Sequence, residues 1–397
     1  MIRIKKSGVL ILLALIFTFN LFTTVAYADE KSSKEETKVE GMDVEAKSAL
    51  LMEVSTGKIL YNKNSNEKFA PASVTKIMTM LITMEEISKG KIKFEDKVTV
   101  SETSKKMGGS TMLLDTGEVR TVEELIKGIA IASGNDAAVA MAEYIGGTEE
   151  GFVNIMNERC AALGMKDTTF KNCTGLPVQG HLTTAYDISI MSRELLKYPD
   201  ILKYTGTYME TISEGRKTPI GLVNHNKLVR FFNGCDGLKT GYTEEAHYCI
   251  SATAVKDGVR VLAVIMGAPT YKVRNKDASM LMNYGFSKFE KKDIVQKDED
   301  IDKVVLDKSG EKYFIAKSND ELSIVIEKGK NVDIKKEIVI DKDRKEYNKG
   351  DIIGYCQYYA GEEVVGKVDI YSDRDLKRAN FIDNMKYNLK NLFKGSI

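Results

Sequence analysis

The sequence has no tryptophan, five prolines and three histidines among its 397 residues. The histidines, His181, His225 and His247, stand far apart and show no metal-ligand spacing such as H-E-x-x-H, which argues against a metal site. So few histidines also leave few candidate bases for a Ser-His-Asp triad. The sequence implies no cofactor.

Neither sign of charge is in excess, because 58 Lys and Arg stand against 57 Asp and Glu. This balance gives no reason to expect a nucleic-acid partner. The five cysteines cannot all pair within the chain, and none forms a C-x-x-C motif. We expect mostly buried or free thiols, with a single disulfide as the alternative.

The N-terminal segment has the pattern of a secretory signal. A short basic segment precedes the apolar run Gly8–Phe19, and Ala26-Tyr27-Ala28 follows with A-x-A spacing. The apolar run is too short to span a bilayer. We therefore expect residues 1–28 to be a signal peptide, and residues 29–44, which are charged and poor in apolar side chains, to be a disordered leader.

Residues 45–285 combine β-prone and helical patterns, whereas residues 288–371 contain only β-prone runs. This change, together with the length of the chain, predicts two domains. Between residues 45 and 285, β-prone runs stand at both ends and helical patterns fill the middle, including a capping box at Thr121 and Glu124. This arrangement predicts an α+β domain whose sheet is assembled from strands distant in sequence. Residues 288–371 contain short β-prone runs between charged turns, and they predict a small all-β domain without catalytic character.

Residues 373–397 are predicted to form an amphipathic helix. Its apolar positions recur at helical spacing, and its basic residues flank or oppose them. The apolar positions are Phe381, Ile382, Met385, Leu389, Leu392 and Phe393. A helix docked on the chain's own β domain, or on a partner, is the alternative to an anionic membrane surface. The terminal position and the basic polar face favour the membrane surface.

The stretch APASVTKIMTM, Ala70–Met80, places Lys76 three residues after Ser73. On a helix, residues three apart share a face, so the Lys76 amine can reach the Ser73 hydroxyl. Lysine can activate a serine only if its pKa falls, through desolvation or a nearby cation. We expect a helix to open at Ser73, and its N-terminus would add backbone N–H groups suited to an oxyanion. Alone, the S-x-x-K motif is weak evidence for a catalytic serine, because a solvated surface lysine fits the same spacing equally well.

Two further motifs strengthen this interpretation. Ser133-Gly134-Asn135 falls between two predicted helices, where a short turn can present a hydroxyl and an amide to a cleft. Lys239-Thr240-Gly241 fits a strand edge that carries a cation, a hydroxyl and a glycine allowing close backbone approach. Each motif alone fits an ordinary turn. In this order, however, the three form a specific signature.

The chain resembles those low-molecular-mass penicillin-binding proteins that act as serine-type D-alanyl-D-alanine carboxypeptidases. The likeness covers Glu45–Gly285 and includes ALLMEVSTGKILYNKNSNEKFAPASVTKIMT, LIKGIAIASGNDAAVAMAEYIGG and LGMKDTTFKNCTGLP. It implies a β-lactamase/transpeptidase-like catalytic domain, an antiparallel sheet flanked by helices, over residues 45–285. The β-rich domain and the basic tail resemble that family's second domain and membrane anchor.

The resemblance implies roles for four residues around the nucleophile. Ser73 would be acylated, and Lys76 would be the base that activates it. Ser133 would relay a proton from the opposite wall of the cleft, and Asn135 would hold the substrate's peptide bond.

The resemblance also implies a substrate-binding strand. Lys239 and Thr240 would bind the terminal carboxylate, and the backbone N–H groups of Ser73 and of Tyr242, which follows Gly241, would form the oxyanion hole. One departure is visible. The family pattern leads us to expect Gly-Tyr-Cys after KTGYTEEA, and this chain has His247-Tyr248-Cys249 instead.

The implied reaction removes the terminal D-alanine from peptidoglycan stem pentapeptides through an acyl-enzyme on Ser73, and β-lactams would acylate the same serine. A β-lactamase is one alternative, although no second base aimed at a deacylating water is identifiable. A catalytically inactive peptidoglycan-binding protein is the other. The expected location is the outer face of the cytoplasmic membrane, at the cell wall.

Overall fold

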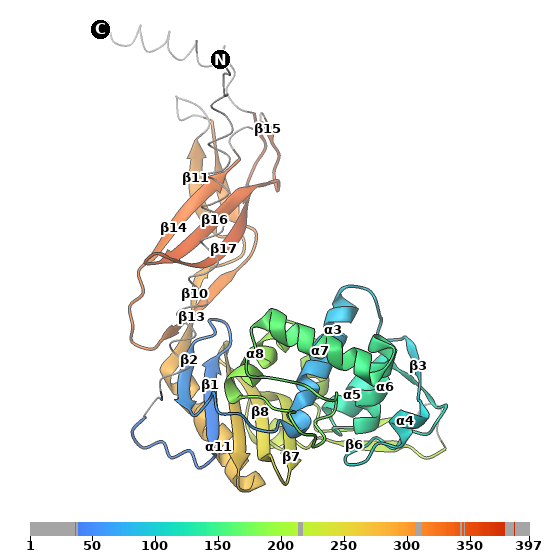
Figure 1. Cartoon of the computed structure of the whole chain (residues 1–397). Coiled ribbons are helices and arrows are strands. Elements are labelled where there is room, and N and C mark those ends of the chain that lie inside the picture. The colour runs from blue at the N-terminus through green and yellow to red at the C-terminus, as the bar shows by residue number, and fades with distance from the viewer. Residues whose placement is uncertain are drawn as a thin grey trace, which may run out of the picture. The chain divides into compact units, whose positions relative to one another are not determined.

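The computed structural model describes residues 36, 39–212, 217–305, 312–341, 344, 346–377 and 385. The chain divides into two compact units, Met1–Ser287 and Lys288–Ile397 (Figure 1). The predicted signal peptide and nearly all of the predicted tail helix lie outside the described residues, as does most of the predicted leader. Within the described part of the chain, no helix has the length and apolarity needed to cross a membrane.

A five-stranded antiparallel sheet forms the centre of the first unit, in the order β2-β1-β9-β8-β7. The strands are β1 (Ser48–Glu53), β2 (Ile59–Lys63), β7 (Cys235–Thr243), β8 (His247–Lys256) and β9 (Val259–Ala268). Strand β1 pairs with β9 in a register that sets Ser48 opposite Met266, so the sheet joins both ends of the domain. This confirms the predicted sheet of sequence-distant strands, and it leaves β7, with the K-T-G motif, at an edge.

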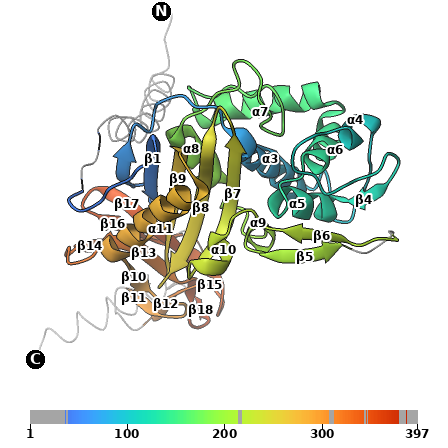
Figure 2. The ribbon, with the colours of Figure 1, turned by 90° about the horizontal axis from the view of Figure 1, so that it is seen from below.

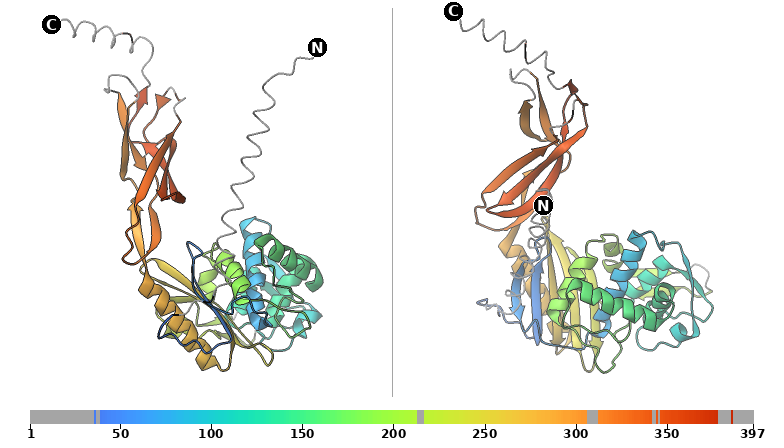
Figure 3. Two further views of the ribbon diagram at one scale, coloured as in Figure 1. Left: turned by 60° about the vertical axis from the view of Figure 1, so that its left-hand side comes forward. Right: turned by 45° about the horizontal axis from the view of Figure 1, so that its top comes forward.

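Helices cover both faces of this sheet (Figures 2 and 3). Helix α11 (Tyr271–Lys288) lies on one face, where an added Cβ on Gly285 would come within 2.8 Å of Val261 Cγ1. Helices α3 (Lys76–Ser88) and α8 (Ala185–Leu195) lie on the other face, and Ser192 of α8 shares a 2.8 Å hydrogen bond with Ser251 of β8. The side chains from Lys76 to Glu85 are all buried, so α3 is the central helix of the domain.

The remaining elements of the first unit build a helical lobe beside the sheet. Its helices are the 3₁₀ turn η1 (Ala72–Thr75), α4 (Glu102–Lys105), α5 (Val122–Ala130), α6 (Asn135–Gly146), α7 (Glu149–Leu163), α9 (Ile201–Thr205) and α10 (Leu228–Phe231). Two two-stranded antiparallel sheets complete it: β3 (Lys97–Thr99) with β4 (Val119–Thr121), and the hairpin of β5 (Met209–Ile212) with β6 (Ile220–Val223).

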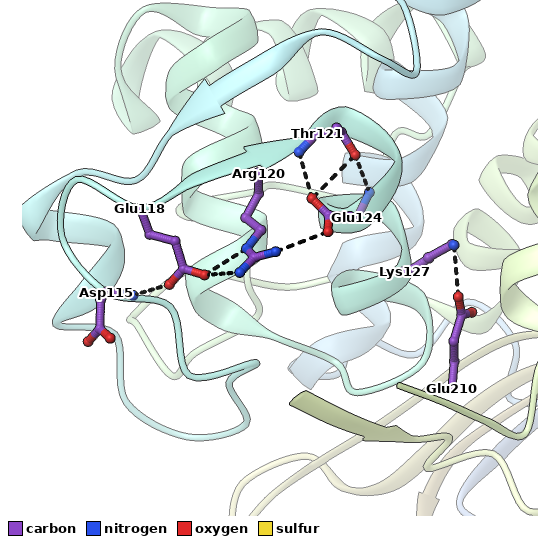
Figure 4. Close-up of polar contacts among 7 residues, drawn as sticks. All are labelled: Asp115, Glu118, Arg120, Thr121, Glu124, Lys127 and Glu210. Carbon is purple, nitrogen blue, oxygen red and sulfur yellow. Dashed lines mark hydrogen bonds and ion pairs between the residues drawn. The ribbon is translucent and has the colours of Figure 1, made fainter. Parts of the chain in front are cut away.

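The predicted capping box is present at the start of α5 (Figure 4). Thr121 Oγ1 accepts from Glu124 N at 3.1 Å, and Thr121 N donates to Glu124 Oε2 at 2.9 Å. Further along α5, Lys127 Nζ lies 2.7 Å from Glu210 Oε1 of β5. This ion pair attaches the β5–β6 hairpin to the helix that leads into the Ser133 turn.

Between Phe289 and Lys377, the regular elements of the described residues of the second unit are all β-strands, as the sequence predicts. Its main sheet has the order β11-β12-β17-β16-β14, and β10 pairs with β13 and β15 with β18. The strands are β10 (Phe289–Val295), β11 (Asp300–Val305), β12 (Tyr313–Ser318), β13 (Leu322–Glu327), β14 (Ile334–Ile340), β15 (Glu346–Tyr347), β16 (Ile352–Ala360), β17 (Glu363–Ser372) and β18 (Leu376–Lys377). Phe314, Tyr347 and Ile370 are fully buried and form part of its core.

All five cysteines are buried and free, which confirms the expectation of buried or free thiols. His247, the departure from the expected Gly-Tyr-Cys pattern, is the first residue of β8 and pairs with Thr243. Its φ is +54°, in the left-handed region that favours glycine. The backbone therefore has the conformation that the expected glycine would adopt without strain.

Candidate active site

Ser73 lies in the 3₁₀ turn η1, and the α-helix begins only at Lys76. The sequence predicted a helix opening at Ser73, so the local geometry differs from the prediction. The predicted contact between Lys76 and Ser73 still forms, because side chains at positions i and i+3 lie over one another in a 3₁₀ turn. Lys76 Nζ lies 3.1 Å from Ser73 Oγ.

Lys76 is completely buried and has two further partners. Its Nζ donates to Asn135 Oδ1 at 2.6 Å and to the Thr174 carbonyl at 2.8 Å. Burial lowers the pKa of Lys76 to about 7. In the neutral amine these two acceptors hold both N–H groups, so the lone pair is left for the Ser73 hydroxyl.

The Ser133-Gly134-Asn135 motif forms the turn between α5 and α6, as predicted. Ser133 is buried and has a φ of +61°, an unfavourable conformation for a residue with a Cβ. Asn135 begins α6, and its Nδ2 donates to the Gly108 carbonyl at 2.6 Å. Because its Oδ1 accepts from Lys76, the Asn135 side chain joins this wall of the site to the catalytic helix.

The Lys239-Thr240-Gly241 motif lies on the edge strand β7 and passes directly beside Ser73. An added Cβ on Gly241 would lie 2.9 Å from Ser73 N and 3.1 Å from Pro71 O, so only glycine fits there without displacing the backbone. Tyr242, which follows, is 46% exposed, and its hydroxyl donates to Glu244 Oε1 at 2.6 Å. The structure thus brings Ser73 and the strand that carries Tyr242 together, as the predicted oxyanion hole requires.

Three buried basic side chains, Lys76, Lys239 and Arg274, belong to the same site. Burial, followed by the charges of Lys76 and Arg274, holds the pKa of Lys239 well below its ordinary value. Arg274, from α11, is 6% exposed, and burial lowers its pKa to about 10. None of the ion pairs formed among the described residues includes Lys76, Lys239 or Arg274. A buried cation without a counter-charge is costly, so this cluster is suited to an incoming anion.

Sequence reasoning missed Thr174, Gly175 and Arg274. Thr174 acts through its backbone carbonyl, for which no side-chain signal exists. Gly175, with a φ of +87°, packs so tightly that an added Cβ would overlap the Ala72 carbonyl. Both belong to the stretch LGMKDTTFKNCTGLP, whose likeness to the family was the available signal. Arg274 looks like an ordinary helical surface cation in the sequence.

His181 and Cys235 do not supply a base for Ser73. His181 Nε2 is hydrogen-bonded to Thr75 Oγ1 at 3.0 Å, and burial lowers its pKa to about 4. Burial raises the pKa of Cys235 to about 11, as befits a structural thiol. No group of His, Cys, Asp or Glu within the described ranges is arranged to hold a metal ion.

The arrangement therefore combines a partly exposed serine, a buried amine with a pKa near neutrality, and an unpaired cationic cluster. The amine can take the serine proton, and the cations can hold a carboxylate. Between them, the Ser73 and Tyr242 backbones flank the point where a carbonyl would sit. This is the constellation of acyl transfer to serine from a substrate that ends in a carboxylate.

Comparison with known proteins points to the same chemistry. A family model described as D-alanyl-D-alanine carboxypeptidase matches residues 33–270, and one described as the C-terminal domain of penicillin-binding protein 5 matches residues 289–378. The chain is 47% identical over 344 residues to the D-alanyl-D-alanine carboxypeptidase DacF of Bacillus subtilis (strain 168), which covers 86% of this chain and 88% of that protein.

Solved structures are similar as well. PBP3 of Streptococcus pneumoniae, described as a peptidoglycan synthesis regulatory factor, matches with 26% identity and a TM-score of 0.69, over 84% of this chain and all of that one. The ampicillin-bound penicillin-binding protein D2 of Listeria monocytogenes matches with 29% identity and a TM-score of 0.56, over 63% of this chain and all of that one.

Proposed function

The chain belongs to the D-alanyl-D-alanine carboxypeptidase family, and from that membership and the site geometry we propose that Ser73 is its acylated nucleophile. The enzyme is a serine hydrolase that removes the terminal D-alanine of peptidoglycan stem peptides. The likeness to DacF over most of both chains favours this activity over a β-lactamase or an inactive wall-binding protein. The 3.1 Å contact between Lys76 Nζ and Ser73 Oγ, with Lys76 buried, carries the assignment of the nucleophile.

In the acylation step, neutral Lys76 takes the proton of Ser73 as Oγ attacks the penultimate carbonyl. The N–H groups of Ser73 and Tyr242 stabilise the oxyanion. The C–N bond breaks, and the departing D-alanine amine receives a proton through Ser133. Water then attacks the ester, Lys76 takes a proton from that water and returns it to Ser73 Oγ as the ester bond breaks, and the shortened peptide leaves as the free acid.

The cationic cluster selects the substrate's end. Lys239 and the Thr240 hydroxyl bind the terminal carboxylate, and Arg274 adds a second buried positive charge. The carboxylate supplies the counter-charge that the described residues do not provide. We assign the peptide bond next to the scissile one to the Asn135 amide, which is hydrogen-bonded to Lys76 and to the Gly108 carbonyl.

β-Lactams acylate the same serine, because a strained amide next to a carboxylate presents the same two groups to the site. The ampicillin-bound form of the Listeria relative supports this part of the proposal. Export, and attachment to the outer face of the cytoplasmic membrane through residues 373–397, form part of the proposal too. They are supported by the signal-like N-terminus and by the basic amphipathic tail.

The direct test is intact-mass spectrometry after incubation with benzylpenicillin, with the adduct mapped by digestion. We expect one adduct, on the peptide that contains Ser73, and D-alanine release from a pentapeptide. Ser73→Ala should lose both. An adduct on another serine, or D-alanine release by Ser73→Ala, would rule the assignment out.

A further inference from the structure

The lone pair of Lys76 points at Ser73 only while both acceptors of its N–H groups stay in place. One acceptor, Asn135 Oδ1, belongs to the first residue of α6, and the same side-chain amide donates to the Gly108 carbonyl. The other acceptor is the backbone carbonyl of Thr174, 2.8 Å from Lys76 Nζ. Thr174 is buried but belongs to no helix or strand. A feature other than regular secondary structure therefore has to fix the direction of this carbonyl.

The side chain of Asn172 organises the backbone around Thr174. We name residues 172–175 the acceptor turn. Asn172 Oδ1 accepts hydrogen bonds from Thr174 N and Thr174 Oγ1, both at 3.1 Å, and from Gly175 N at 2.7 Å. Asn172 Nδ2 donates to the Leu176 carbonyl at 2.9 Å. One amide side chain thus makes four hydrogen bonds within five consecutive residues.

The hydrogen bond from Gly175 N decides where the Thr174 carbonyl points. The carbonyl of Thr174 and the N–H of Gly175 belong to one peptide unit, which is planar. In this trans unit the C=O and the N–H point in opposite directions. Because Asn172 Oδ1 holds the N–H, the C=O is turned away from Asn172, and Lys76 Nζ donates to it there.

Neighbouring elements hold the acceptor turn in position. Thr79, which follows Lys76 by three residues on α3, donates from Oγ1 to the Cys173 carbonyl at 2.8 Å. Glu149, the first residue of α7, accepts through Oε1 from Cys173 N at 3.1 Å and from Cys173 Sγ at 3.2 Å. These contacts act on Cys173, whereas the hydrogen bonds on the peptide after Thr174 come from Asn172 and Lys76.

We propose that Asn172 is a positioning residue of the reaction, because it orients the peptide that holds Lys76. The hydrogen bond that it accepts from Gly175 N aims the Thr174 carbonyl at one N–H of Lys76. The lone pair of the neutral amine is then directed at the Ser73 hydroxyl. This inference rests on the proposed function, in which Lys76 is the base. Asparagine is a common turn residue, but here the oriented carbonyl contacts the catalytic amine, which links the turn to the reaction.

The loss of Asn172 should act on proton transfer. The peptide after Thr174 can then turn and withdraw its carbonyl from Lys76 Nζ. The neutral amine rotates about its Cε–Nζ bond, and an N–H in place of the lone pair faces Ser73 Oγ for part of the time. Since the proton of Ser73 Oγ can pass only to the lone pair, acylation slows even at a pH where Lys76 is already neutral.

The test measures the second-order rate constant of acylation by benzylpenicillin against pH in the full-length enzyme. Rates are corrected for the fraction of enzyme that reacts, so that partial unfolding does not count as slow chemistry. The variants are Asn172→Ala, which removes all four hydrogen bonds, and Asn172→Asp, which keeps an acceptor in place of Oδ1. The control is Asn157→Ala. Asn157 is hydrogen-bonded to both the N–H and the carbonyl of Phe170, two residues before the acceptor turn, at 2.9 Å.

The two variants should change different parts of the pH profile. We expect the plateau rate of Asn172→Ala to fall roughly 10- to 100-fold, because the base is then poorly aligned. Asn172→Asp should stay within a fewfold of the wild-type plateau, since aspartate accepts the same turn hydrogen bonds. Its added negative charge should raise the pKa of Lys76 and move the midpoint of the profile above its wild-type value. Asn157→Ala should change neither the plateau nor the midpoint.

The other titratable groups around Lys76 are the same in all of these variants. Asp136 of α6 favours the protonated amine, and the charge of Lys239 on β7 opposes that of Lys76. Cys173 is a neutral thiol, because burial raises its pKa well above the ordinary value. Burial lowers the pKa of His225 to about 4, so its imidazole is neutral near the midpoint. A raised midpoint in the aspartate variant therefore reports the new charge in the acceptor turn.

Each outcome is decisive. A slow Asn172→Ala, a near-normal plateau with a raised midpoint in Asn172→Asp, and an unchanged control support the proposal. Wild-type acylation by the alanine variant overturns it, and so does a control that slows equally, which would mean that the whole segment has loosened. If the alanine variant does not fold, the aspartate variant decides, because a wild-type midpoint there overturns the proposal and a raised one supports it. A wild-type enzyme that benzylpenicillin does not acylate at Ser73 instead contradicts the proposed function.

Discussion

Gly241 and Ser73 are so close that an added Cβ on Gly241 would lie 2.9 Å from the Ser73 backbone nitrogen. The same Cβ would lie 3.0 Å from Ala72 Cβ. Ala72 cannot easily yield, because its φ is already +47° and its carbonyl is packed against Gly175. Close approach of β7 to the 3₁₀ turn thus sets the spacing between the two backbone N–H groups of the proposed oxyanion hole.

We expect Gly241→Ala to slow acylation by benzylpenicillin roughly 10- to 100-fold, because misplacing a donor by a fraction of an ångström to one ångström weakens transition-state binding. Stopped-flow or mass-resolved acylation kinetics give the rate. The matched control is Gly221→Ala, also at a strand glycine, where an added Cβ meets nothing within 4 Å. A variant that acylates at the wild-type rate would show that this approach does not shape the oxyanion hole.

Acylation should depend on the protonation of Lys76. Burial lowers its pKa to about 7, so the amine is mostly protonated below pH 7 and carries a free lone pair above it. The rate should therefore rise with pH, tenfold per unit in the acidic limb, and level off above a midpoint near 7. The pH profile of the second-order rate of benzylpenicillin acylation measures this directly.

Lys76→Arg should abolish the rising limb, because a guanidinium does not deprotonate in proteins. Lys76→Met is the control for the larger size of arginine, because methionine is similar in length to lysine and uncharged. Acylation of this variant should be equally slow. Thermal unfolding confirms that both variants fold. Acylation within a fewfold of wild type in either variant would mean that another group serves as the base.

Lys239 should discriminate in favour of a free terminal carboxylate. A substrate whose terminal carboxylate is amidated has no negative charge to balance the buried basic cluster, so the wild type should hydrolyse it poorly. Lys239→Ala should react slowly with both substrates and narrow the ratio between them. The ratio of kcat/KM values is the readout, and an unchanged ratio in the variant would place carboxylate recognition elsewhere, with Arg274 the next candidate.

His247→Gly should stabilise the protein. The φ of +54° costs an L-residue about 1 kcal/mol that glycine does not incur. Urea unfolding of the variant should show a higher midpoint, partly offset by the greater flexibility of glycine in the unfolded chain. His247→Ala retains the strain and is the control. Equal midpoints for the glycine and alanine variants would indicate that the side chain, not the backbone, governs stability here.

The sequence predicted the structural elements that are determined by residues close together in the chain. The capping box at Thr121, the turn at Ser133 and the strand at Lys239 follow from residue types and spacing, and the structure has them where expected. The pairing of the S-x-x-K residues was also predictable, because a separation of three brings them together in a 3₁₀ turn as in an α-helix. The edge position of the strand with the K-T-G motif, and the close backbone approach at Gly241, were predictable from residue type as well.

What the sequence could not predict depends on packing between distant segments. Lys76 is buried among segments far away in the chain, including Asn135 and Thr174, which accept its hydrogen bonds, and this burial is the main cause of its lowered pKa. Arg274 joins the cationic cluster because α11 lies across the sheet, which helical periodicity does not specify. The preference of the turn for a 3₁₀ rather than an α-helical start depends on contacts with β7 and Gly175.

The C-terminal tail gives the last prediction. Strand β18, Leu376–Lys377, pairs with β15, and Asp375 Oδ1 accepts from Lys349 N at 2.7 Å, so a clean truncation should begin after Lys377. Removing residues 378–397 removes the apolar stripe and most of the basic residues that we propose to lie on anionic lipid. D-alanine release from a soluble peptide should be unchanged, and the protein should move from the pellet to the supernatant in sedimentation with anionic vesicles.

A second variant, Lys386→Gln/Lys390→Gln/Lys394→Gln, keeps the apolar stripe and should bind the same vesicles more weakly and with less dependence on salt. If the truncated enzyme sediments as fully as the intact one, the tail is not the anchor, and the alternative of a helix docked on the chain or on a partner gains instead.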